Sequence, residues 1–316
     1  MTRKSIDNLV NIVLPSFGDI KSALEVCEEI ERKLTIKCRI FILDDSAGVD
    51  KYPKLPTNYF RIIASQNLGQ QTILTEFFKI FLSLSELKQI SNLIVVLDAD
   101  GEDKPLDVIR MLELAIENPF QSKIILAERR QREVPFIFKI SYKLFQLIGK
   151  FLTGIYIKHG TFCVINSEIL SKHIENDSFK YSFVGGLASI PTNKTYLPCD
   201  RGKRRYGQSH LNFKRLIEHG LEIYIALDIK LRNLKYLKSI LLTLFTLELL
   251  LIYSTIQIAK KFSLASISIS IIFSLPILLL IILFYSIKIV SLKKLKSLEN
   301  FQNKKIFKNF PTISNY

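Results

Sequence analysis

Cysteine, sequence repeats and low-complexity linkers are scarce or missing in this chain of 316 residues. The four cysteines form no C-x-x-C pair and no other spacing typical of a metal site, which disfavours both a disulfide framework and a zinc module. We expect reduced, mostly buried thiols in a protein that faces the cytosol. No long apolar run occurs before Asp19, so no signal peptide is expected.

Acidic residues are the scarcer charged class: 29 Asp and Glu stand against 44 Lys and Arg, giving a formal net charge of +15. Such a balance suits a phosphate-rich partner, either nucleic acid or anionic lipid. No basic residue occurs between Lys238 and Lys260, and no charged residue between Lys261 and Lys288. Each stretch exceeds the ~18 apolar residues typical of a transmembrane helix. These stretches favour a lipid bilayer as the partner, and no nucleic acid.

The two apolar stretches predict a transmembrane helical hairpin over 236–290, with spans at about 239–259 and 264–287. A hairpin buried in a soluble protein is the alternative, but it would need a far larger body around it. Glu248 lies near the middle of the first span, where an unpaired carboxylate costs roughly 2.5 to 3.5 kcal/mol. We expect it to face another helix, a neighbouring subunit of a homo-oligomer or a lipid head group.

Basic residues flank the outer ends of the hairpin more densely than its turn. They are Lys230, Arg232, Lys235 and Lys238 before the first span, and Lys288, Lys293, Lys294 and Lys296 after the second. By the positive-inside rule, the N-terminal domain and the basic tail over 291–316 are both cytoplasmic. The sequence thus predicts a two-pass integral membrane protein, of the bacterial inner membrane type.

The preceding 210 residues alternate strand and helix patterns in the manner of βα units. Strands are predicted at 9–14, 39–43, 60–64, immediately before Asp98, and at 123–127, and helices at 20–34, 70–84 and 106–117. This alternation predicts an α/β fold with a doubly wound, mainly parallel sheet.

A cluster of carboxylates follows the strand before Asp98. Residues 93–97 are all Leu, Ile or Val, as in a strand buried on both faces. Asp98 and Asp100 leave the same face of an extended chain, and Glu102 continues the series. Carboxylates at the carboxyl end of such a strand suit a divalent metal, Mg²⁺ or Mn²⁺, bound to a nucleotide pyrophosphate. For an isolated D-x-D, an acidic turn that caps the helix near Pro105 is the alternative.

Six short segments follow one another in a recognisable order. They are 14–19 (LPSFGD), 43–46 (LDDS), 67–70 (NLGQ), 98–105 (DADGEDKP), 129–132 (RRQR) and 201–210 (RGKRRYGQSH). Together they resemble the motifs of family 2 inverting glycosyltransferases, whose fold is GT-A, a Rossmann-like, doubly wound domain expected here over 1–210. With two C-terminal apolar stretches, the layout is similar to the polyprenyl-phosphate branch, which includes dolichol-phosphate mannose synthase and bactoprenol glucosyltransferases.

The resemblance implies a role for each motif. Residues that would bind the nucleoside diphosphate sugar are Pro15, Asp19, Asp44, Asp45, Asn67, Gly69 and Asp98. Residues that would hold Mg²⁺ or Mn²⁺ are Asp98, Asp100 and Glu102, with Glu102 in place of the family's usual Gln. Residues that would bind the acceptor phosphate are Arg129, Arg132, Arg201, Arg204, Ser209 and His210, with His210 in place of Lys. The catalytic set implied is Asp98, Asp100, Arg129, Arg132, Arg201 and Arg204.

The arginines also suit phosphate on chemical grounds, because a guanidinium is a planar donor fork. A solvated basic loop is the alternative, and for Arg130, Lys203 and Arg205 we expect that role or contact with lipid head groups.

The acceptor is indicated by a missing acid. Relatives that glycosylate a sugar hydroxyl place an acidic general base before the last strands, whereas the corresponding segment here, 182–189, has none. A phosphate monoester needs no base, since its second pKa of about 6 leaves it largely dianionic at pH 7. This favours a polyprenyl phosphate as the acceptor. A hydroxyl of a lipid-linked or cell-surface glycan is the alternative acceptor, and a non-catalytic nucleotide-sugar-binding subunit or a transport or scaffold component are further alternatives.

Two segments combine apolar and basic residues as interfacial helices do, 134–156 and 211–235. We expect both to lie on the membrane surface. An ordinary core helix is the alternative for the first.

Overall fold

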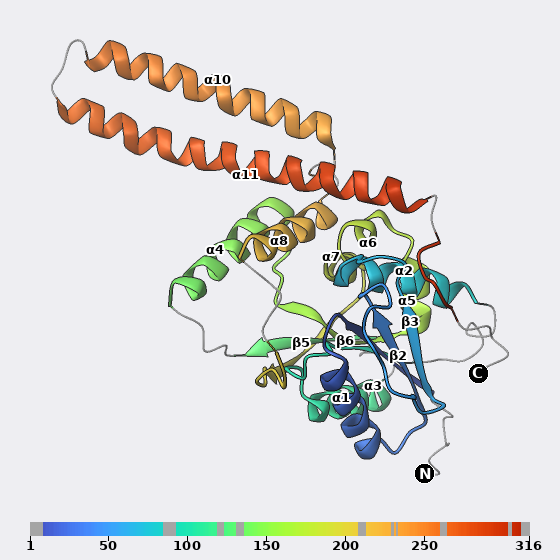
Figure 1. The fold of residues 1–316 in the computed structure, drawn as a ribbon. Coiled ribbons are helices and arrows are strands. Elements are labelled where there is room, and N and C mark those ends of the chain that lie inside the picture. Colours follow the sequence, from blue (N-terminus) through green and yellow to red (C-terminus); the bar gives the residue numbers. More distant parts are fainter. Residues whose placement is uncertain are drawn as a thin grey trace.

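The computed structural model describes residues 9–84, 93–118, 123–130, 136–207, 213–228, 231, 233–259, 264–302 and 305–310. In these ranges a seven-stranded sheet carries helices on both faces, and two long helices form a hairpin that projects from it (Figure 1). The strands are β1 (Val10–Ser16), β2 (Cys38–Asp44), β3 (Tyr59–Ile63), β4 (Leu93–Val96), β5 (Ile124–Arg130), β6 (His159–Asn166) and β7 (Thr195–Asp200). The helices are α1 (Ile20–Lys33), α2 (Gln70–Ser83), α3 (Pro105–Glu117), α4 (Phe136–Thr153), α5 (Ser167–His173), α6 (Asp177–Tyr181), α7 (Phe183–Ser189), α8 (Phe213–Leu227), α10 (Leu234–Ala259) and α11 (Leu264–Gln302). The predicted α/β fold class with two long apolar C-terminal helices is confirmed.

The sheet has the strand order β3-β2-β1-β4-β6-β5-β7. Its first half is parallel, so the carboxyl ends of β1, β2, β3 and β4 meet at one edge. Strand β6 runs antiparallel to both β4 and β5, and β7 runs parallel to β5. All five predicted strands are present, whereas β6 and β7 were not identified from the sequence.

Strand β4 is buried on both faces, as its unbroken apolar run predicts. Ile94 and Val96 lie in the core beneath α2, α5, α6 and α7, while Val95 and Leu97 lie in the core beneath α1 and α3. Since successive side chains of a strand point to opposite faces, each core receives alternate residues. The carboxylates after β4 are therefore anchored to the middle of the domain.

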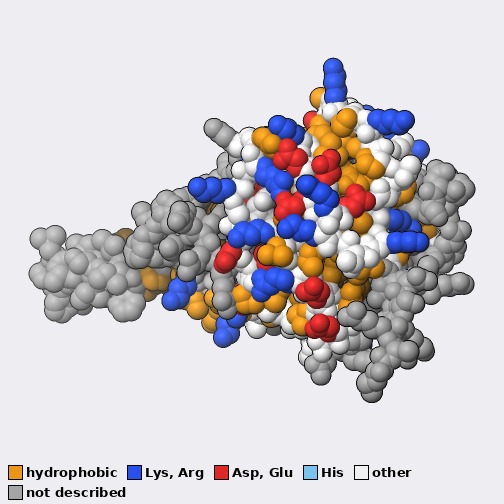
Figure 2. Space-filling model, turned by 90° about the horizontal axis from the view of Figure 1, so that it is seen from below, with side chains coloured by type: hydrophobic (Ala, Val, Ile, Leu, Met, Phe, Trp, Pro, Cys, Tyr) orange, Lys and Arg blue, Asp and Glu red, His pale blue; other side chains and the backbone are white. Residues whose placement is uncertain are grey.

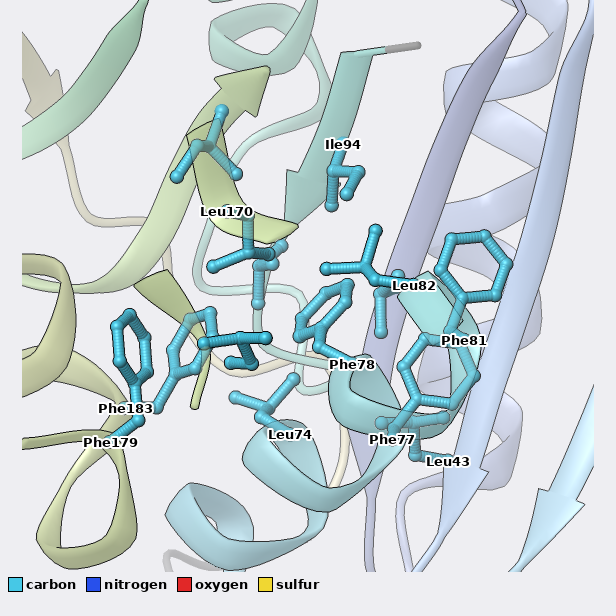
Figure 3. Close-up of a cluster of buried hydrophobic side chains, with 14 of the residues drawn as sticks. Leu43, Leu74, Phe77, Phe78, Phe81, Leu82, Ile94, Leu170, Phe179 and Phe183 are labelled. Carbon is cyan, nitrogen blue, oxygen red and sulfur yellow. The ribbon is translucent and has the colours of Figure 1, made fainter. Parts of the chain in front are cut away.

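Phenylalanines of α2 pack in the core on the face of the sheet that α2, α5, α6 and α7 cover. Phe77 and Phe81 stack with ring centroids 5.1 Å apart, and Phe78 stacks on Phe183 of α7 at 5.6 Å (Figure 3). Such aromatic pairs add roughly 0.5–1.5 kcal/mol each beyond the area they bury. This packing holds the first turn of α2 against the edge where the parallel strands end.

Helices α10 and α11 are long and apolar enough to cross a membrane, over Lys235–Gln257 and Ser274–Glu299. The predicted spans fall within them, and the turn at Lys260 and Lys261 lies outside the described residues. At 1.5 Å per residue the 39-residue α11 is about 58 Å long. It continues past the predicted end of the span because Ile287 and Val290 pack against α8. Crossing of a membrane stays a prediction.

Glu248 lies near the middle of α10. Its Oε2 atom is buried, and the described part of the chain gives it no hydrogen-bond partner. Its predicted contact with another helix, a neighbouring subunit or a lipid head group stays a prediction.

Helices α4 and α8 form a close pair beneath α11 (Figure 1). Phe145 stacks on Tyr224 with ring centroids 4.5 Å apart. A Cβ at Gly149 would lie 2.4 Å from the Tyr224 ring, and one at Gly220 would lie 2.3 Å from the Phe145 ring. The two glycines therefore allow the helices to approach through their aromatic side chains.

The other face of this pair is apolar and exposed. Leu144, Leu147 and Phe151 of α4 are 56%, 52% and 87% exposed, and Leu216 and Ile217 of α8 are nearly half exposed. Helix α4 is therefore not an ordinary core helix. Its predicted place on a membrane surface stays a prediction.

Candidate functional site

Acidic residues gather where the parallel strands end. Asp19 follows β1, Asp44 and Asp45 lie at the end of β2, and Asp98 and Asp100 follow β4. Because β2, β1 and β4 are adjacent and parallel, these residues meet at one edge of the sheet. Ligands of open α/β sheets bind outside this edge.

Asp98 is oriented by two neighbours. Its Oδ1 accepts hydrogen bonds from Gln70 Nε2 at 2.6 Å and from Thr161 Oγ1 at 2.9 Å. Its backbone N–H donates to Asp103 Oδ2 at 3.1 Å, so Asp103 closes the turn. Its Oδ2 faces Arg201 Nη2 at 3.9 Å. Thr161 was missed from the sequence because it lies on β6, which no pattern had revealed.

Asp100 is only 8% exposed. Its Oδ1 accepts from the backbone N–H of Glu102 at 3.0 Å, across a turn in which Gly101 adopts φ of 81°. Its Oδ2 lies 3.5 Å from Arg204 Nη1 and 4.0 Å from Arg201 Nη2. Burial, followed by the negative charge of Asp98, raises the pKa of Asp100 above its usual value, although both guanidiniums act in the opposite direction.

The loop after β7 brings two arginines to these acids. Arg201 pairs with Glu102 through Nε, and Arg204 Nη2 donates to Asp19 Oδ1 and Oδ2 at 2.5 and 2.7 Å. Backbone bonds fix the approach: Gly202 N–H donates to Glu102 O at 2.8 Å, and Arg205 N–H to Asp100 O at 3.0 Å. The structure thus unites the first, fourth and sixth motifs of the sequence.

Arg205 anchors the same loop on α1. Its guanidinium pairs with Glu29 at 2.5 Å and with Glu25 at 3.6 Å, and Tyr206 Oη donates to Glu25 at 2.7 Å. The expectation that Arg205 is solvated or contacts lipid is therefore wrong, because two carboxylates of α1 bind it. On the surface seen from below, Lys and Arg side chains lie interspersed with Asp and Glu side chains (Figure 2).

The site carries an excess of negative charge. Four carboxylates (Asp19, Asp98, Asp100 and Glu102) face two guanidiniums (Arg201 and Arg204), which leaves a formal charge of −2. Across the described ranges, no three or more metal-ligating side chains are arranged to hold an ion by themselves. Asp98 and Asp100 instead present one oxygen each to the same guanidinium nitrogen. Two carboxylates fit Mg²⁺ or Mn²⁺ when substrate phosphates and water complete the coordination.

The Asp44 and Asp45 carboxylates are bound by other groups of the protein. Asp44 is fully buried: Oδ1 accepts from Ser46 N and Oγ at 2.9 and 2.6 Å, and Oδ2 pairs with Arg61. Asp45 accepts from the backbone N–H groups of Leu68 and Gly69 at 2.6 and 2.8 Å. Burial raises the pKa of Asp45 to about 6. These carboxylates join the second motif to the third, and their contact with a nucleotide stays a prediction.

The remaining predicted residues line this edge or lie beyond the described parts. Asn67 is exposed, Pro15 is half-buried at the end of β1, and a Cβ at Gly69 would meet no described atom within 4 Å. The backbone of Arg129 aligns with Cys199, two residues before Arg201, so both arginine motifs begin at adjacent strand ends. The Arg129 side chain, and all of Arg132, Ser209 and His210, lie outside the described residues.

Residues 182–189, which contain no acidic residue, form the N-cap Ser182 and helix α7. Ser182 Oγ accepts from Gly185 N–H at 3.2 Å, and Gln71 Oε1 accepts from Ser182 Oγ and from Val184 N–H at 3.1 and 3.0 Å. Gln71 follows Gln70, the residue that orients Asp98. Helix α7 is therefore bonded to the first turn of α2 and carries no carboxylate of its own.

No family model matches the chain, and no curated protein matches it. Among solved structures, mannosyl-3-phosphoglycerate synthase from Rubrobacter xylanophilus is similar at 15% identity and a TM-score of 0.44, over 73% of this chain and 76% of that one. Mannosyltransferase PcManGT from Pyrobaculum calidifontis, in complex with GDP-Man and Mn²⁺, is similar at 11% identity and a TM-score of 0.45, over 93% and 88%. Glucosyl-3-phosphoglycerate synthase from Mycobacterium tuberculosis, in complex with Mn²⁺, UDP and glucosyl-3-phosphoglycerate, gives 10% identity and a TM-score of 0.42, over 70% and 80%.

Proposed function

We propose that this protein is an inverting, metal-dependent glycosyltransferase that moves a sugar from a nucleoside diphosphate sugar to a polyprenyl phosphate at the cytoplasmic face of a membrane. The observation that carries the proposal is the meeting of Asp98, Asp100 and Glu102 with Arg201 and Arg204 at the carboxyl edge of the parallel strands. Carboxylates that can share a divalent metal, next to paired guanidiniums, suit a diphosphate and a second phosphate held together.

The donor would lie along the edge between β2 and β4. Mg²⁺ or Mn²⁺, when bound, supplies the positive charge that neutralises the departing diphosphate. Asp98 and Asp100 are held ready for the ion by Gln70 and by the turn at Gly101. Arg201 and Arg204 now pair with the carboxylates, so each would exchange that partner for a phosphate when the substrates enter.

The acceptor would supply its own nucleophile. A phosphate monoester oxygen forms a bond to the anomeric carbon, and the bond from that carbon to the diphosphate oxygen breaks on the opposite side, which inverts the configuration. No side chain has to remove a proton, because the monoester is largely dianionic at pH 7. This fits the lack of an acidic residue in α7, the segment that corresponds to the general-base region of enzymes that glycosylate a hydroxyl.

The apolar surfaces would bring the enzyme to its lipid. Large apolar side chains are exposed along α10 and α11, and Leu147 and Phe151 extend this exposure to α4. Apolar patches of this extent do not face water in a soluble monomer. We assign the hairpin to the bilayer and α4 to its cytoplasmic surface.

Product analysis tests the proposal. Membranes containing the protein are supplied with radiolabelled nucleoside diphosphate sugars, undecaprenyl phosphate and Mn²⁺ or Mg²⁺. We expect a lipid-linked sugar that mild acid releases, as a sugar monophosphate linkage requires. An acid-resistant glycoside would instead assign the acceptor as a hydroxyl of a glycan.

A variant pair tests the site itself. Asp100→Asn removes the negative charge that faces both guanidiniums, and we expect turnover to fall at least a hundredfold. Asp177→Asn, an exposed change on α6 that leaves the site intact, is the control and should retain wild-type turnover. Unchanged turnover and sugar-nucleotide hydrolysis in Asp100→Asn would show that these carboxylates do not hold a metal.

A further inference from the structure

Residues 305–310, here called the C-terminal strap, return from the membrane hairpin to the sheet. They follow α11, and they pass α2 on the way to β3 (Figure 1). Strand β3 forms one edge of the sheet, and the strap lies along the carboxyl half of that edge. A segment next to the hairpin in sequence thus meets the motif end of the catalytic domain.

The strap pairs with backbone groups at the exposed edge of β3. Ser65 N–H donates to Ile306 O at 2.8 Å, and Lys308 N–H donates to Ile63 O at 2.8 Å. The Asn309 amide spans the same strand: Oδ1 accepts from Ile63 N–H at 2.7 Å, and Nδ2 donates to Arg61 O at 2.7 Å. These bonds fix the register of the strap on β3.

Aromatic packing secures the strap from beneath. Phe307 is 2% exposed within the core that α2 covers. Phe310 lies 5.8 Å from the ring of Phe77 and 5.9 Å from that of Phe307. Burial of these aromatic side chains removes apolar surface from water, so the strap is held by its own hydrophobic contacts.

Lys308 reaches from the strap to the turn after β2. Its ammonium donates to Ala47 O at 2.6 Å. Ala47 has φ of 59°, a left-handed conformation that is costly for a residue with a Cβ. The hydrogen bond from the ammonium holds the Ala47 carbonyl and so favours this conformation of the turn.

This turn joins the segments proposed to bind the nucleotide. Asp45, two residues before Ala47, holds the backbone of Leu68 and Gly69. Asp50 Oδ2, at its other end, accepts from Gly18 N–H at 2.9 Å, next to Asp19. The turn therefore connects three of the motifs, and Lys308 of the strap contacts it at Ala47.

We infer that Lys308 is a positioning residue for the nucleotide half of the donor. It acts through its hydrogen bond to the turn over 44–50 and does not contact the reacting atoms, while Asn309 fixes the strap on β3. The inference rests on the proposed function, because it assumes that a nucleoside diphosphate sugar occupies this edge. It assigns to the chain after the second membrane helix a role in donor affinity.

The test uses the full membrane protein with Lys308→Met, which keeps the side-chain stem and removes the ammonium. We expect the Kd for the nucleoside diphosphate sugar, measured by calorimetry with Mn²⁺, to rise about tenfold. This is the effect expected when the hydrogen bond from the Lys308 ammonium to Ala47 O is lost. The KM for the donor should rise by a similar factor, while kcat stays within about twofold. Lys308→Arg restores a donor at this position and should recover most of the affinity. Lys305→Met, an exposed change three residues earlier, is the control and should bind as the wild type does.

Two results would overturn the inference. One is an unchanged Kd in Lys308→Met while the wild type binds the nucleotide sugar. The other is an equal fall of kcat with the rise in KM, which indicates general damage. If the wild type binds no nucleotide sugar, the proposed function fails. Amide hydrogen exchange then tests by itself whether the strap supports the turn over 44–50. Faster exchange over 44–50 in Lys308→Met than in Lys305→Met then supports the strap, and equal exchange rejects it.

Discussion

Replacement of Gly101 by Ala should loosen the loop that carries the arginines. Gly101 has φ of 81°, where a side chain costs about 1–2 kcal/mol. The new Cβ would also lie 2.6 Å from Arg205 Cγ, so the arginine must move. Moving it breaks ion pairs with Glu29 and Glu25, which are partly exposed and contribute about 1 kcal/mol together. We expect a total cost of about 2–3 kcal/mol.

A second glycine separates strain from contact. Gly154, at the end of α4, has φ of 73°, and a Cβ there would meet no described atom within 4 Å. Gly154→Ala should therefore show the backbone cost alone, a fall in melting temperature of about 2–8 °C at 2–4 °C per kcal/mol. Gly101→Ala should lower the melting temperature further than Gly154→Ala does. It should also weaken binding of the Mn²⁺ complex of a nucleoside diphosphate roughly fivefold, measured by calorimetry.

The contact is checked by a double-mutant cycle with Arg205→Ala. In that background the cost of Gly101→Ala should drop to that of Gly154→Ala, because the arginine side chain is gone. Equal melting temperatures and unchanged nucleotide affinity for Gly101→Ala and Gly154→Ala in the wild-type background would refute the reasoning.

Two further predictions concern protonation and the membrane. The folded-state pKa of Asp45, about 6 against 3.8 for the free group, means that its contribution to stability is largest in acid and is lost as pH rises from about 4 to 6. The difference in melting temperature between the wild type and Asp45→Asn should change over this range and be constant above about pH 7; a constant difference throughout would contradict the assigned pKa. Leu147→Asp combined with Phe151→Asp should lower turnover with polyprenyl phosphate in vesicles at least tenfold and leave nucleotide-sugar affinity within about twofold. Undiminished turnover in vesicles would show that α4 does not lie on the membrane surface.

The parts of the fold that the sequence predicts are those encoded by local pattern. The run before Asp98 identifies β4 because a strand buried on both faces needs apolar residues at every position, and both cores receive them. The acids follow directly, so their place at the sheet edge is also predictable. The doubly wound layout comes from the alternation of such strands with amphipathic helices.

The parts that it missed depend on pairing between distant segments. Strand β6 inserts antiparallel between β4 and β5, and Thr161 on it reaches Asp98 across 63 residues of chain. Phe307 pairs with Ala64 in the same non-local way. Arg205 resembles any other basic residue of its loop until α1 places Glu25 and Glu29 beside it. Composition and spacing carry no information on such partners.

The C-terminal strap has a consequence for the order in which the protein is made. Synthesis releases residues 9–207 first, then the hairpin, and only afterwards the residues that complete the edge of β3. Domains begin to fold as they emerge, so the sheet forms while that edge still lacks its partner. A chain halted before the hairpin would therefore carry all its acidic and arginine motifs but an unsupported turn over 44–50. Support of the turn over 44–50 by Lys308 therefore becomes available only after α10 and α11 have been made.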